Sequence, residues 1–437
     1  MYAQYRGMIL RLSSPAARGL FVLLAFALAL ILPYSGIHNA LAAHDAELNT
    51  LEGYERAVQL EPEDARNWYL LGRYWQYNLE DPDNQRAIRA YQTALSFDAH
   101  SADTWMDLAT AYESEGDIAA ARNAFFQAKS VYYLSPEVSW RYGNFLLRRG
   151  ELDAAFAEFK HAVEADPKRG PAAFALCMRF EPDVQAVLER VLPHSQAAYI
   201  SLISALSEQQ QTDQALIAWS SLAALHPHLD IKESYPLLGA LIHKRQMTEA
   251  QSVWGQALAF AGVSRPPDPP GSLVWDGGFE SNIAMGGFTW YYPTFTNGVQ
   301  ITLDTKERRS GNRSLRLTFN GLRNVNFSDV CQYVAVQPST AYRFSAWVQT
   351  RDISTDQGVR FGLRSLSESG NPIVSTEDAK GTQPWTRVEL PWTSGKDVQE
   401  LQLCVSRLPS AKFDSKIGGT AWIDDVALVP QSAENTR

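Results

Sequence analysis

Hydrophobic positions recur along this chain with two different periods. From about residue 45 to 262 they return every three or four residues, which is the pattern of amphipathic helices. Beyond residue 272 the period becomes two, and stretches such as "SLRLTF" (314–319) and "YRFSAWVQ" (342–349) alternate apolar and polar side chains. The pattern therefore predicts a helical segment followed by eight or more strands, for which a two-sheet antiparallel sandwich is the simplest architecture.

The helical segment carries a 34-residue repeat. "WYLLGRYW" (68–75) and "WMDLATAY" (105–112) open the first helices of two units. The segment resembles a tetratricopeptide array, which implies five to six antiparallel helix pairs stacked as an α-solenoid. Small residues let paired helices approach while aromatic residues fill the gap beside them, so the repeated positions are expected to be structural. They are Ala87, Ala121 and Ala155; Tyr91, Phe125 and Phe159; and Ala94, Ala128 and Ala162.

This resemblance places an inner groove, suited to a protein partner, on the first helix of each pair. Packing between neighbouring first helices accounts equally well for the aromatic residues of the groove. The pattern of basic and amide residues that clamps a peptide carboxylate in some tetratricopeptide proteins is only fragmentary here, so no particular peptide is predicted. The predicted groove residues are Tyr69, Arg73, Met106, Trp140, Asn144 and Arg148.

Residues 1–42 have the layout of a secretory signal or a membrane anchor. Three arginines precede the apolar run at 19–32, and an Ala-x-Ala sequence ends at Ala42. Fourteen residues are few for a membrane span, so cleavage and retention both stay open, as does a buried core helix. The basic flank sends the rest of the chain out of the cytoplasm, which predicts a periplasmic protein or one anchored to the inner membrane by this segment.

Proline marks the end of the helical region. "SRPPDPPGS" (264–272) contains four prolines, which cannot continue a helix and favour a stiff extended spacer. The predicted organisation is residues 1–42 as signal or anchor, 43–262 as helical repeats, 263–271 as linker, 272–431 as sandwich and 432–437 as tail.

The sandwich segment resembles jelly-roll carbohydrate-binding modules of the galactose-binding-like type. The similar segments occur in order and span 272–430: "LVWDGGFES" (273–281), "RSGNRSLRL" (309–317), "YVAVQPSTAYRFSAWVQT" (333–350) and "IGGTAWIDDVAL" (417–428). The resemblance implies a jelly roll whose first and last strands are neighbours. The whole chain is thus expected to be multidomain, an α-solenoid followed by an all-β jelly roll.

A carboxylate in the last strand raises the question of a metal. Alternation turns Asp424 inward, where a charge is costly unless it is paired or metal-bound. In the modules that this segment resembles, a structural calcium ion joins a Glu of the first strand to an Asp of the last, which here implies Glu280 and Asp424, with Asp425 as the rival. Hydrogen bonds from backbone N–H groups, Ser310 or Arg309 are the alternative.

The same alternation suggests a sugar-binding face. Trp347 points outward beside Arg343, and a tryptophan platform ringed by guanidinium groups would suit a glycan that carries carboxylates. This holds if the strands share one sheet; otherwise a loop covers the tryptophan and the arginines pair with acids. The other predicted members are Arg316, Arg360 and Arg364 on further strands, with Trp290, Tyr291 and Tyr292 of the loop 286–295 at the rim.

Two of the three cysteines lie in sandwich strands. Cys331 and Cys404 both point outward, and an oxidising compartment permits a disulfide if their strands are neighbours. Cys177 falls on a helix and is expected to be a buried thiol.

Composition and motifs narrow the function. The formal net charge is −9, and the chain lacks the basic stripe of a nucleic-acid binder. No nucleophile elbow, HExxH motif or phosphate loop is present, and Asp424 and Asp425 point to opposite faces, unlike the paired carboxylates of a glycosidase. We therefore expect a non-catalytic scaffold that binds protein and glycan in envelope or exopolysaccharide assembly. A protein scaffold with a purely structural cap, and an enzyme acting on polysaccharide, are the alternatives.

Overall fold

The computed structural model describes residues 15–282, 285–292, 298–365 and 373–431. The chain forms two compact units, residues 1–169 and 170–437, which are described separately. Arg6 and Arg11 of the predicted basic flank, and the predicted tail 432–437, lie outside the described residues. Among the residues that are described, no helix combines the length and apolar character needed to cross a membrane.

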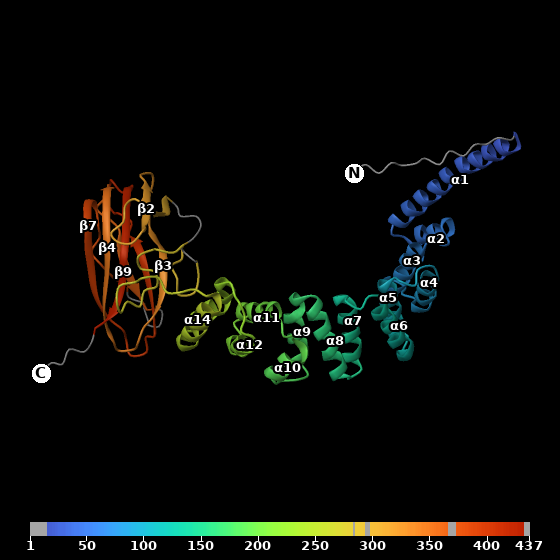
Figure 1. Ribbon diagram of the computed structural model, residues 1–437, viewed down its shortest axis with the longest axis horizontal. Helices are drawn as coiled ribbons and strands as arrows, with labels where there is room; N and C mark the ends of the chain where they lie inside the picture. The colour runs from blue at the N-terminus through green and yellow to red at the C-terminus, as the bar shows by residue number, and fades with distance from the viewer. Residues whose placement is uncertain (1–14, 283–284, 293–297, 366–372, 432–437) are drawn as a thin grey trace. The chain divides into compact units, whose positions relative to one another are not determined.

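The first unit consists of helices (Figure 1). They are α1 (Pro15–Glu47), α2 (Leu51–Leu60), α3 (Ala65–Tyr77), α4 (Asn84–Phe97), α5 (Ala102–Ser114), α6 (Ile118–Val131), α7 (Pro136–Arg148), α8 (Leu152–Ala165) and the short 3-10 helix η1 (Pro167–Arg169). Local sequence sets where these helices begin. Ser135, for example, accepts a hydrogen bond from the Val138 N–H and is followed by Pro136 in the first turn, so α7 begins there.

The repeated residues form the contacts within each helix pair, as the 34-residue period predicts. Tyr91, Phe125 and Phe159 are all at most 1% exposed. Gly72 on α3 shows how tight the contact is, because a Cβ atom there would lie 2.6 Å from the Tyr91 ring on α4. These positions stabilise the solenoid and leave the groove side of the first helices to other residues.

The second unit begins with further helix pairs. They are α9 (Gly170–Cys177), α10 (Val184–Val191), α11 (Gln196–Glu208), α12 (Thr212–Ala224), the 3-10 helix η2 (Ile231–Ser234), α13 (Tyr235–His243) and α14 (Met247–Ala261). Cys177 is buried and unpaired, as expected.

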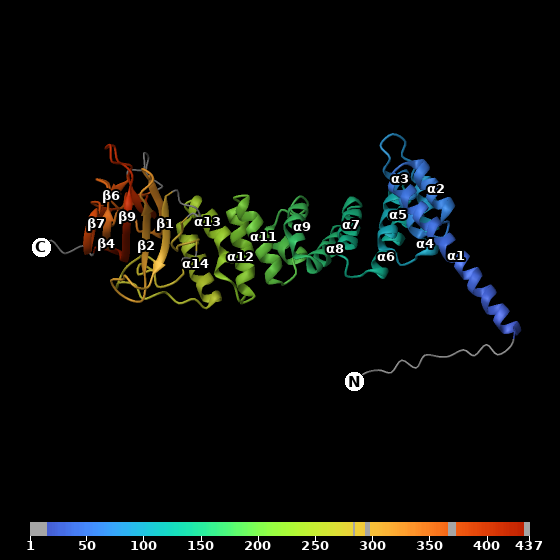
Figure 2. The same cartoon turned by 90° about the horizontal axis from the view of Figure 1, so that it is seen from above.

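The sandwich of the second unit contains two antiparallel sheets (Figures 1 and 2). One sheet has the order β1-β2-β9-β4-β7 and the other β3-β8-β5-β6. Between them lies an apolar core built from the inward positions of the alternating strands. The strands are β1 (Val299–Asp304), β2 (Ser314–Asn320), β3 (Phe327–Ala335), β4 (Ala341–Ile353), β5 (Arg360–Arg364), β6 (Val374–Ser375), β7 (Gly381–Thr393), β8 (Glu400–Arg407) and β9 (Gly418–Pro430).

The segment "LVWDGGFE", expected to be the first strand, is irregular. Asp276 and Phe279 have positive φ angles of 54°, which a strand does not accommodate. The segment still lies beside β9, because the Leu273 N–H donates to the Leu428 carbonyl and the Val426 N–H donates to the Gly277 carbonyl. It therefore occupies the expected place without forming a strand.

The proline-rich residues 263–271 form neither helix nor strand, and they do not separate the last helices from the sandwich. Asp268 accepts hydrogen bonds from the Asp276 and Gly277 N–H groups, and Arg265 donates to the carbonyls of Ser272 and Val274. Both side chains therefore tie this segment to the sandwich rather than leaving it as a free spacer.

The last helix pair also packs directly on the sandwich. Trp254 of α14 meets Trp275 edge to face at 5.4 Å between ring centroids. Gly286 approaches α13 so closely that a Cβ atom there would lie 2.3 Å from the Tyr235 ring. Helices α9–α14 and the sandwich consequently form one compact unit, and its boundary falls at residue 170 rather than at the prolines.

Candidate functional site

The predicted ring of arginines is divided between the two outer faces of the sandwich. Arg316 on β2 and Arg343 on β4 belong to the five-stranded sheet, whereas Arg360 and Arg364 on β5 belong to the four-stranded sheet. The expectation that they surround Trp347 on one sheet is therefore wrong. Alternation shows which side chains point outward, but strand pairing decides onto which of the two outer faces.

The aromatic residues predicted for the sugar site contact other parts of the protein, so their rings are not free to stack on a sugar. The Arg309 guanidinium lies 4.4 Å from the centre of the Trp347 ring, as in the loop-covered alternative. Trp290 is only 1% exposed and packs on Phe279, so its placement at the rim is wrong. Tyr292 is partly buried against the sandwich core.

A pocket of about 620 Å³ lies on the outer face of the four-stranded sheet. Its size is within the range of ~300–1,000 Å³ that is usual for ligand pockets. The two buried cysteines contribute to its lining, and charged and polar groups from the strands β3, β5, β6 and β8 surround them. The lining includes Tyr291, Asp329, Arg360, Arg364, Ser375, Gln402, Ser406 and the apolar Ile373 and Leu408.

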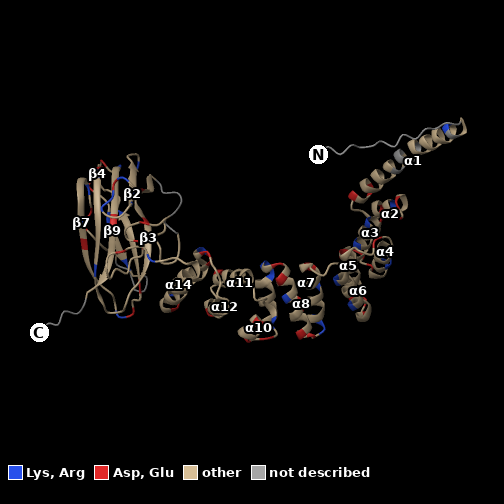
Figure 3. Cartoon of the chain, in the orientation of Figure 1, with Lys and Arg blue, Asp and Glu red and all other residues tan. Residues whose placement is uncertain are grey.

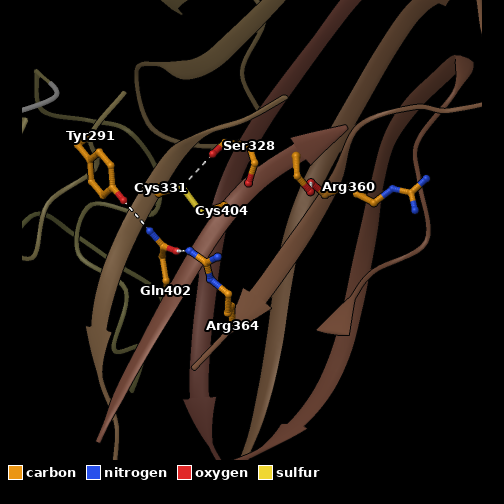
Figure 4. The surroundings of a disulfide bond; sticks show 8 residues. Tyr291, Ser328, Cys331, Arg360, Arg364, Gln402 and Cys404 are labelled. Atoms are coloured by element: carbon orange, nitrogen blue, oxygen red, sulfur yellow. Dashed lines mark hydrogen bonds between the residues drawn. A yellow bond between two sulfur atoms is a disulfide. The ribbon is translucent and has the colours of Figure 1, made fainter. Parts of the chain in front are cut away.

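A chain of hydrogen bonds holds the polar side chains of this pocket in place (Figure 4). Arg364 donates to the Gln402 Oε1, and the Gln402 Nε2 donates to the Tyr291 hydroxyl at 2.7 Å. The backbone of Tyr291 exchanges two hydrogen bonds with Cys331 on β3, and burial raises the pKa of its hydroxyl. Tyr291 is thus a fixed and neutral aromatic side chain in the pocket wall. Gln402 links its hydroxyl to the guanidinium of Arg364.

Arg360 supplies the second guanidinium of the pocket. Its Nη2 donates to Gln357 at 2.6 Å and lies 3.5 Å from the Asp378 Oδ2. Arg360 therefore pairs with an acid of its own domain, as the alternative interpretation of the arginines predicted. Arg364 instead donates to a neutral amide, which leaves it the stronger candidate for a ligand carboxylate.

Cys331 and Cys404 form a disulfide bond in the lining of the pocket. The two residues lie directly opposite each other on the neighbouring strands β3 and β8, which is the condition that the sequence left open. The bond fixes the register of these strands, so the side chains of Tyr291 and Gln402 keep their relative positions.

The sequence indicated Tyr291 only as one aromatic residue of the rim loop, and it gave no indication of Gln402. Tyr291 follows the buried Trp290 in an irregular segment, so no periodicity assigned it to a face. Gln402 alternates correctly on β8, but a lone glutamine carries no chemical signal without its partners. The three clearly alternating aromatic and basic residues Trp347, Arg343 and Arg316 lie on the opposite sheet.

The buried Asp424 is satisfied by hydrogen bonds. Its Oδ2 accepts from the N–H groups of Arg309 at 2.8 Å and Ser310 at 3.1 Å, and its Oδ1 accepts from the Asp425 N–H. Glu280 likewise accepts from the N–H groups of Asn312 and Arg313. A calcium ion would have to replace some of these donors, and no cluster of three or more His, Cys, Asp or Glu side chains suited to a metal occurs within the described ranges. Calcium therefore stays a prediction, and the geometry already accounts for the carboxylates without it.

Asp424 should make the stability of the sandwich depend on pH. Burial raises its pKa from 3.8 to about 6, so the folded state binds the proton more tightly than the unfolded state. The stabilising contribution is full below pH 4 and is lost as the pH rises through 6. At about 1.4 kcal/mol per pKa unit, we expect wild type to lose up to about 3 kcal/mol between pH 4 and 7 relative to Asp424→Asn. Denaturant unfolding of the full chain at several pH values measures this difference.

The same measurement tests calcium, because a bound cation would favour the ionised carboxylate and reverse the pH effect. Calcium would then raise the melting temperature and a chelator would lower it, and both Glu280→Ala and Asp424→Ala would remove that response. The exposed Asp414→Asn is the matched control and should change neither profile. An unaltered melting temperature in chelator leaves hydrogen bonds as the whole explanation.

In the first unit, two of the predicted groove residues, Tyr69 and Arg73, approach a buried carboxylate. Asp107 of α5 accepts hydrogen bonds from Arg141 at 2.8 Å and from the Tyr69 hydroxyl at 3.1 Å, and lies 3.8 Å from Arg73. Burial, and to a lesser extent the negative charge of Asp107, raises the pKa of Tyr69 to about 12. The Tyr69 hydroxyl therefore stays protonated and can donate a hydrogen bond. Asp107 and Arg141 were absent from the predicted set, although they organise it.

The remaining predicted groove residues have separate roles. Met106 is 2% exposed, so its assignment to the groove is wrong. Trp140 packs on Phe159, Asn144 donates to the Trp140 carbonyl, and Arg148 pairs with Glu113 at 2.7 Å. For Trp140 the packing alternative therefore applies.

Arg73 lines a hollow formed by α2, α3 and the turns beside them. This open hollow, of about 600 Å³, is lined by Asn49, Tyr54, Leu70, Arg73, Tyr74, Tyr77, Asn78, Leu79 and Glu80. The Arg73 guanidinium lies within 6 Å of the Tyr69 and Tyr77 rings and is half exposed. It is the cation of this hollow best placed to meet a partner.

Comparisons with known proteins agree with the two architectures. The family model described as tetratricopeptide repeat matches residues 79–130 and 107–169. No curated protein matches the chain. Among solved structures, the chain is similar to YrrB, a TPR protein with an unusual peptide-binding site, at 15% identity and a TM-score of 0.25, covering 49% of this chain and 94% of YrrB.

The sandwich has similar solved structures of its own. One is a family 16 carbohydrate-binding module, at 18% identity and a TM-score of 0.27, covering 36% of this chain and 99% of the module. Another is a xylan-binding domain of family 22, at 13% identity and a TM-score of 0.27, covering 37% of this chain and 97% of the domain. Residues 79–169, which match the tetratricopeptide repeat model, form helix pairs, and an antiparallel two-sheet sandwich follows later in the chain.

Proposed function

We propose that this protein is a non-catalytic, extracytoplasmic adaptor that joins a protein partner to a glycan. The tetratricopeptide helices bind the protein partner, and the four-stranded sheet binds a polysaccharide bearing carboxylates. Envelope or exopolysaccharide assembly is the setting that such a pair of activities suits. Lysine, arginine and acidic residues are interspersed over helices and strands (Figure 3), which fits discrete contacts better than a nucleic-acid surface.

The pocket with Tyr291, Gln402 and Arg364 carries the proposal. A sugar ring can pack on a tyrosine face while the glutamine amide and the guanidinium bind its hydroxyl and carboxylate groups. Because hydrogen bonds and the disulfide hold these side chains, little conformational entropy is lost on binding. The domain names of the similar structures, which include a xylan-binding domain, support a carbohydrate as the class of ligand.

Two features support the extracytoplasmic setting. A disulfide bond persists in oxidising compartments and is rare in the cytosol. The apolar run at 19–32 follows basic residues, as secretory signals and anchors require.

For the protein partner, the hollow at Arg73 is the proposed site. A half-exposed guanidinium between two tyrosine rings suits an acidic side chain or a terminal carboxylate of an extended peptide.

The glycan proposal is tested with polygalacturonate and with neutral xylan, measured by affinity electrophoresis of the full chain. We expect polygalacturonate to be retained, and Arg364→Gln to weaken retention roughly 10- to 100-fold, because a charge-assisted hydrogen bond contributes about 1.5–3 kcal/mol. Added salt should weaken wild-type binding in the same direction, since it screens the charge.

Arg343→Gln is the matched control, since it removes a guanidinium from the opposite sheet and should leave retention unchanged. If Arg343→Gln weakens binding and Arg364→Gln does not, the five-stranded sheet is the binding face. If folded wild type retains neither polysaccharide, the sandwich is a structural cap.

A further inference from the structure

A second hollow lies where the last helix pair meets the sandwich, within the same compact unit. It measures about 590 Å³ and is similar in volume to the pocket on the four-stranded sheet. Gly239, His243 and Arg245 line it from α13 and the turn that follows, and Tyr291 and Tyr333 line it from the sandwich. We call it the α13 groove.

The α13 groove and the sheet pocket share a wall. Tyr291 lines both, and its ring stacks on that of Tyr333 with 5.8 Å between centroids and 21° between planes. The hydrogen bond from Gln402 and the two backbone bonds to Cys331 fix Tyr291 from the pocket side. The stacked pair therefore forms one aromatic surface that borders both hollows.

Charge also continues from one hollow to the other. The guanidinium groups of Arg360 and Arg364 line the pocket, and that of the exposed Arg245 lines the groove. The acidic group in either lining is Asp329, and burial raises its pKa. A repeating polyanion fits this row of cations better than a neutral chain does.

The floor of the groove is open at α13. Gly239 is exposed, and a Cβ atom there would meet nothing within 4 Å. Space above a helix surface at a glycine, between an aromatic wall and two basic side chains, can take a sugar ring close to the backbone.

We propose that the polysaccharide bound over the four-stranded sheet continues past Tyr291 into the α13 groove, so that the last helical pair supplies a subsite of the glycan site. The inference rests on the proposed glycan-binding function and deepens it. The ligand is then an acidic polysaccharide longer than the sheet pocket alone can hold. Part of it contacts helix α13 and the turn that follows. Helix α13 thereby acts as a length-selecting element.

The test uses the full chain and oligogalacturonides of two to ten residues, with binding measured by isothermal titration calorimetry. We expect wild-type affinity to rise by about tenfold or more once the oligomer outgrows the sheet pocket. Gly239→Phe fills the groove and should abolish this gain while leaving the affinity of short oligomers unchanged. The fold should tolerate it, because the position is open and glycine is a poor helix former.

Gly255→Phe is the matched control. Gly255 lies on α14, is exposed and also has nothing within 4 Å of its Cβ position, but it does not line the groove. It should bind long and short oligomers as wild type does. Arg245→Gln is a second test variant that adds no bulk to the groove. It should reduce both the increase in affinity for long oligomers and the sensitivity of that increase to salt.

The outcomes separate the two proposals. If short and long oligomers bind and neither Gly239→Phe nor Arg245→Gln changes the gain with length, the groove is not a subsite and the sheet pocket stands alone. If wild type binds no oligomer of any length, the glycan-binding function itself is overturned, and the α13 subsite with it.

Discussion

Replacing Arg407 with methionine should destabilise the second unit by about 3 kcal/mol or more. Arg407 is 0% exposed at the end of β8, and burial lowers its pKa although the charge of Asp356 opposes that shift. Its guanidinium donates to the Val325, Gln357 and Ser415 carbonyls and to the side chains of Asn324 and Thr355.

The cost follows from the groups that Arg407→Met leaves behind. A buried carbonyl without a partner costs about 1–3 kcal/mol, and three carbonyls lose their donor together. The relief from no longer burying a charge offsets part of this loss. Because the partners flank the beginnings of β3 and β5, the variant should also loosen the pocket that contains Arg364.

Denaturant unfolding of the full chain measures the effect. Arg387→Met is the control, since Arg387 lies on β7, is half exposed and pairs with Glu389 on the surface, where such pairs contribute about 0–1 kcal/mol. Equal stability of the two variants would show that the buried guanidinium contributes nothing net.

Asp107→Ala should destabilise the first unit by about 3–5 kcal/mol. The Asp107 side chain is only 7% exposed and is the common partner of Arg141, Tyr69 and Tyr77. Removing one partner of a buried ion pair leaves the other charge uncompensated, which is the expensive case. The variant should also free Arg73 from its nearest acid and thereby alter the hollow proposed for the protein partner.

Asp103→Ala is the matched control, because Asp103 lies one turn earlier on the same helix and is exposed. Asp103→Ala should lower the free energy of unfolding by at most about 1 kcal/mol, because it removes a favourable interaction with the helix dipole. A double variant with Arg141→Met should recover part of the loss, since it removes the unpaired charge. If Asp107→Ala unfolds like Asp103→Ala, the buried cluster does not stabilise the solenoid.

Much of the candidate site could not be read from the sequence. Arg360 and Arg364 were predicted as outward and basic, and both line the pocket. Trp347 and Arg343 were predicted by the same alternation and lie on the other sheet. Tyr291 was indicated only as an aromatic residue of the rim loop, because an irregular segment has no period that assigns it to a face. Gln402 was not indicated, because an amide gains a role only from its neighbours in the fold.

The sequence by itself determined the kinds of elements and their order. Period and spacing are local properties, so the change from 3.6 to 2 separates helices from strands, and the 34-residue series identifies the tetratricopeptide pairs and their buried residues. The tertiary structure alone decided which strands share a sheet, that Tyr291 joins the pocket to α13, and that the proline-rich segment ties the last helices to the sandwich. Each of these depends on contacts between residues far apart in the chain, such as Cys331 with Cys404 or Trp254 with Trp275, and hydrophobic period carries no information about which distant partner a face will meet.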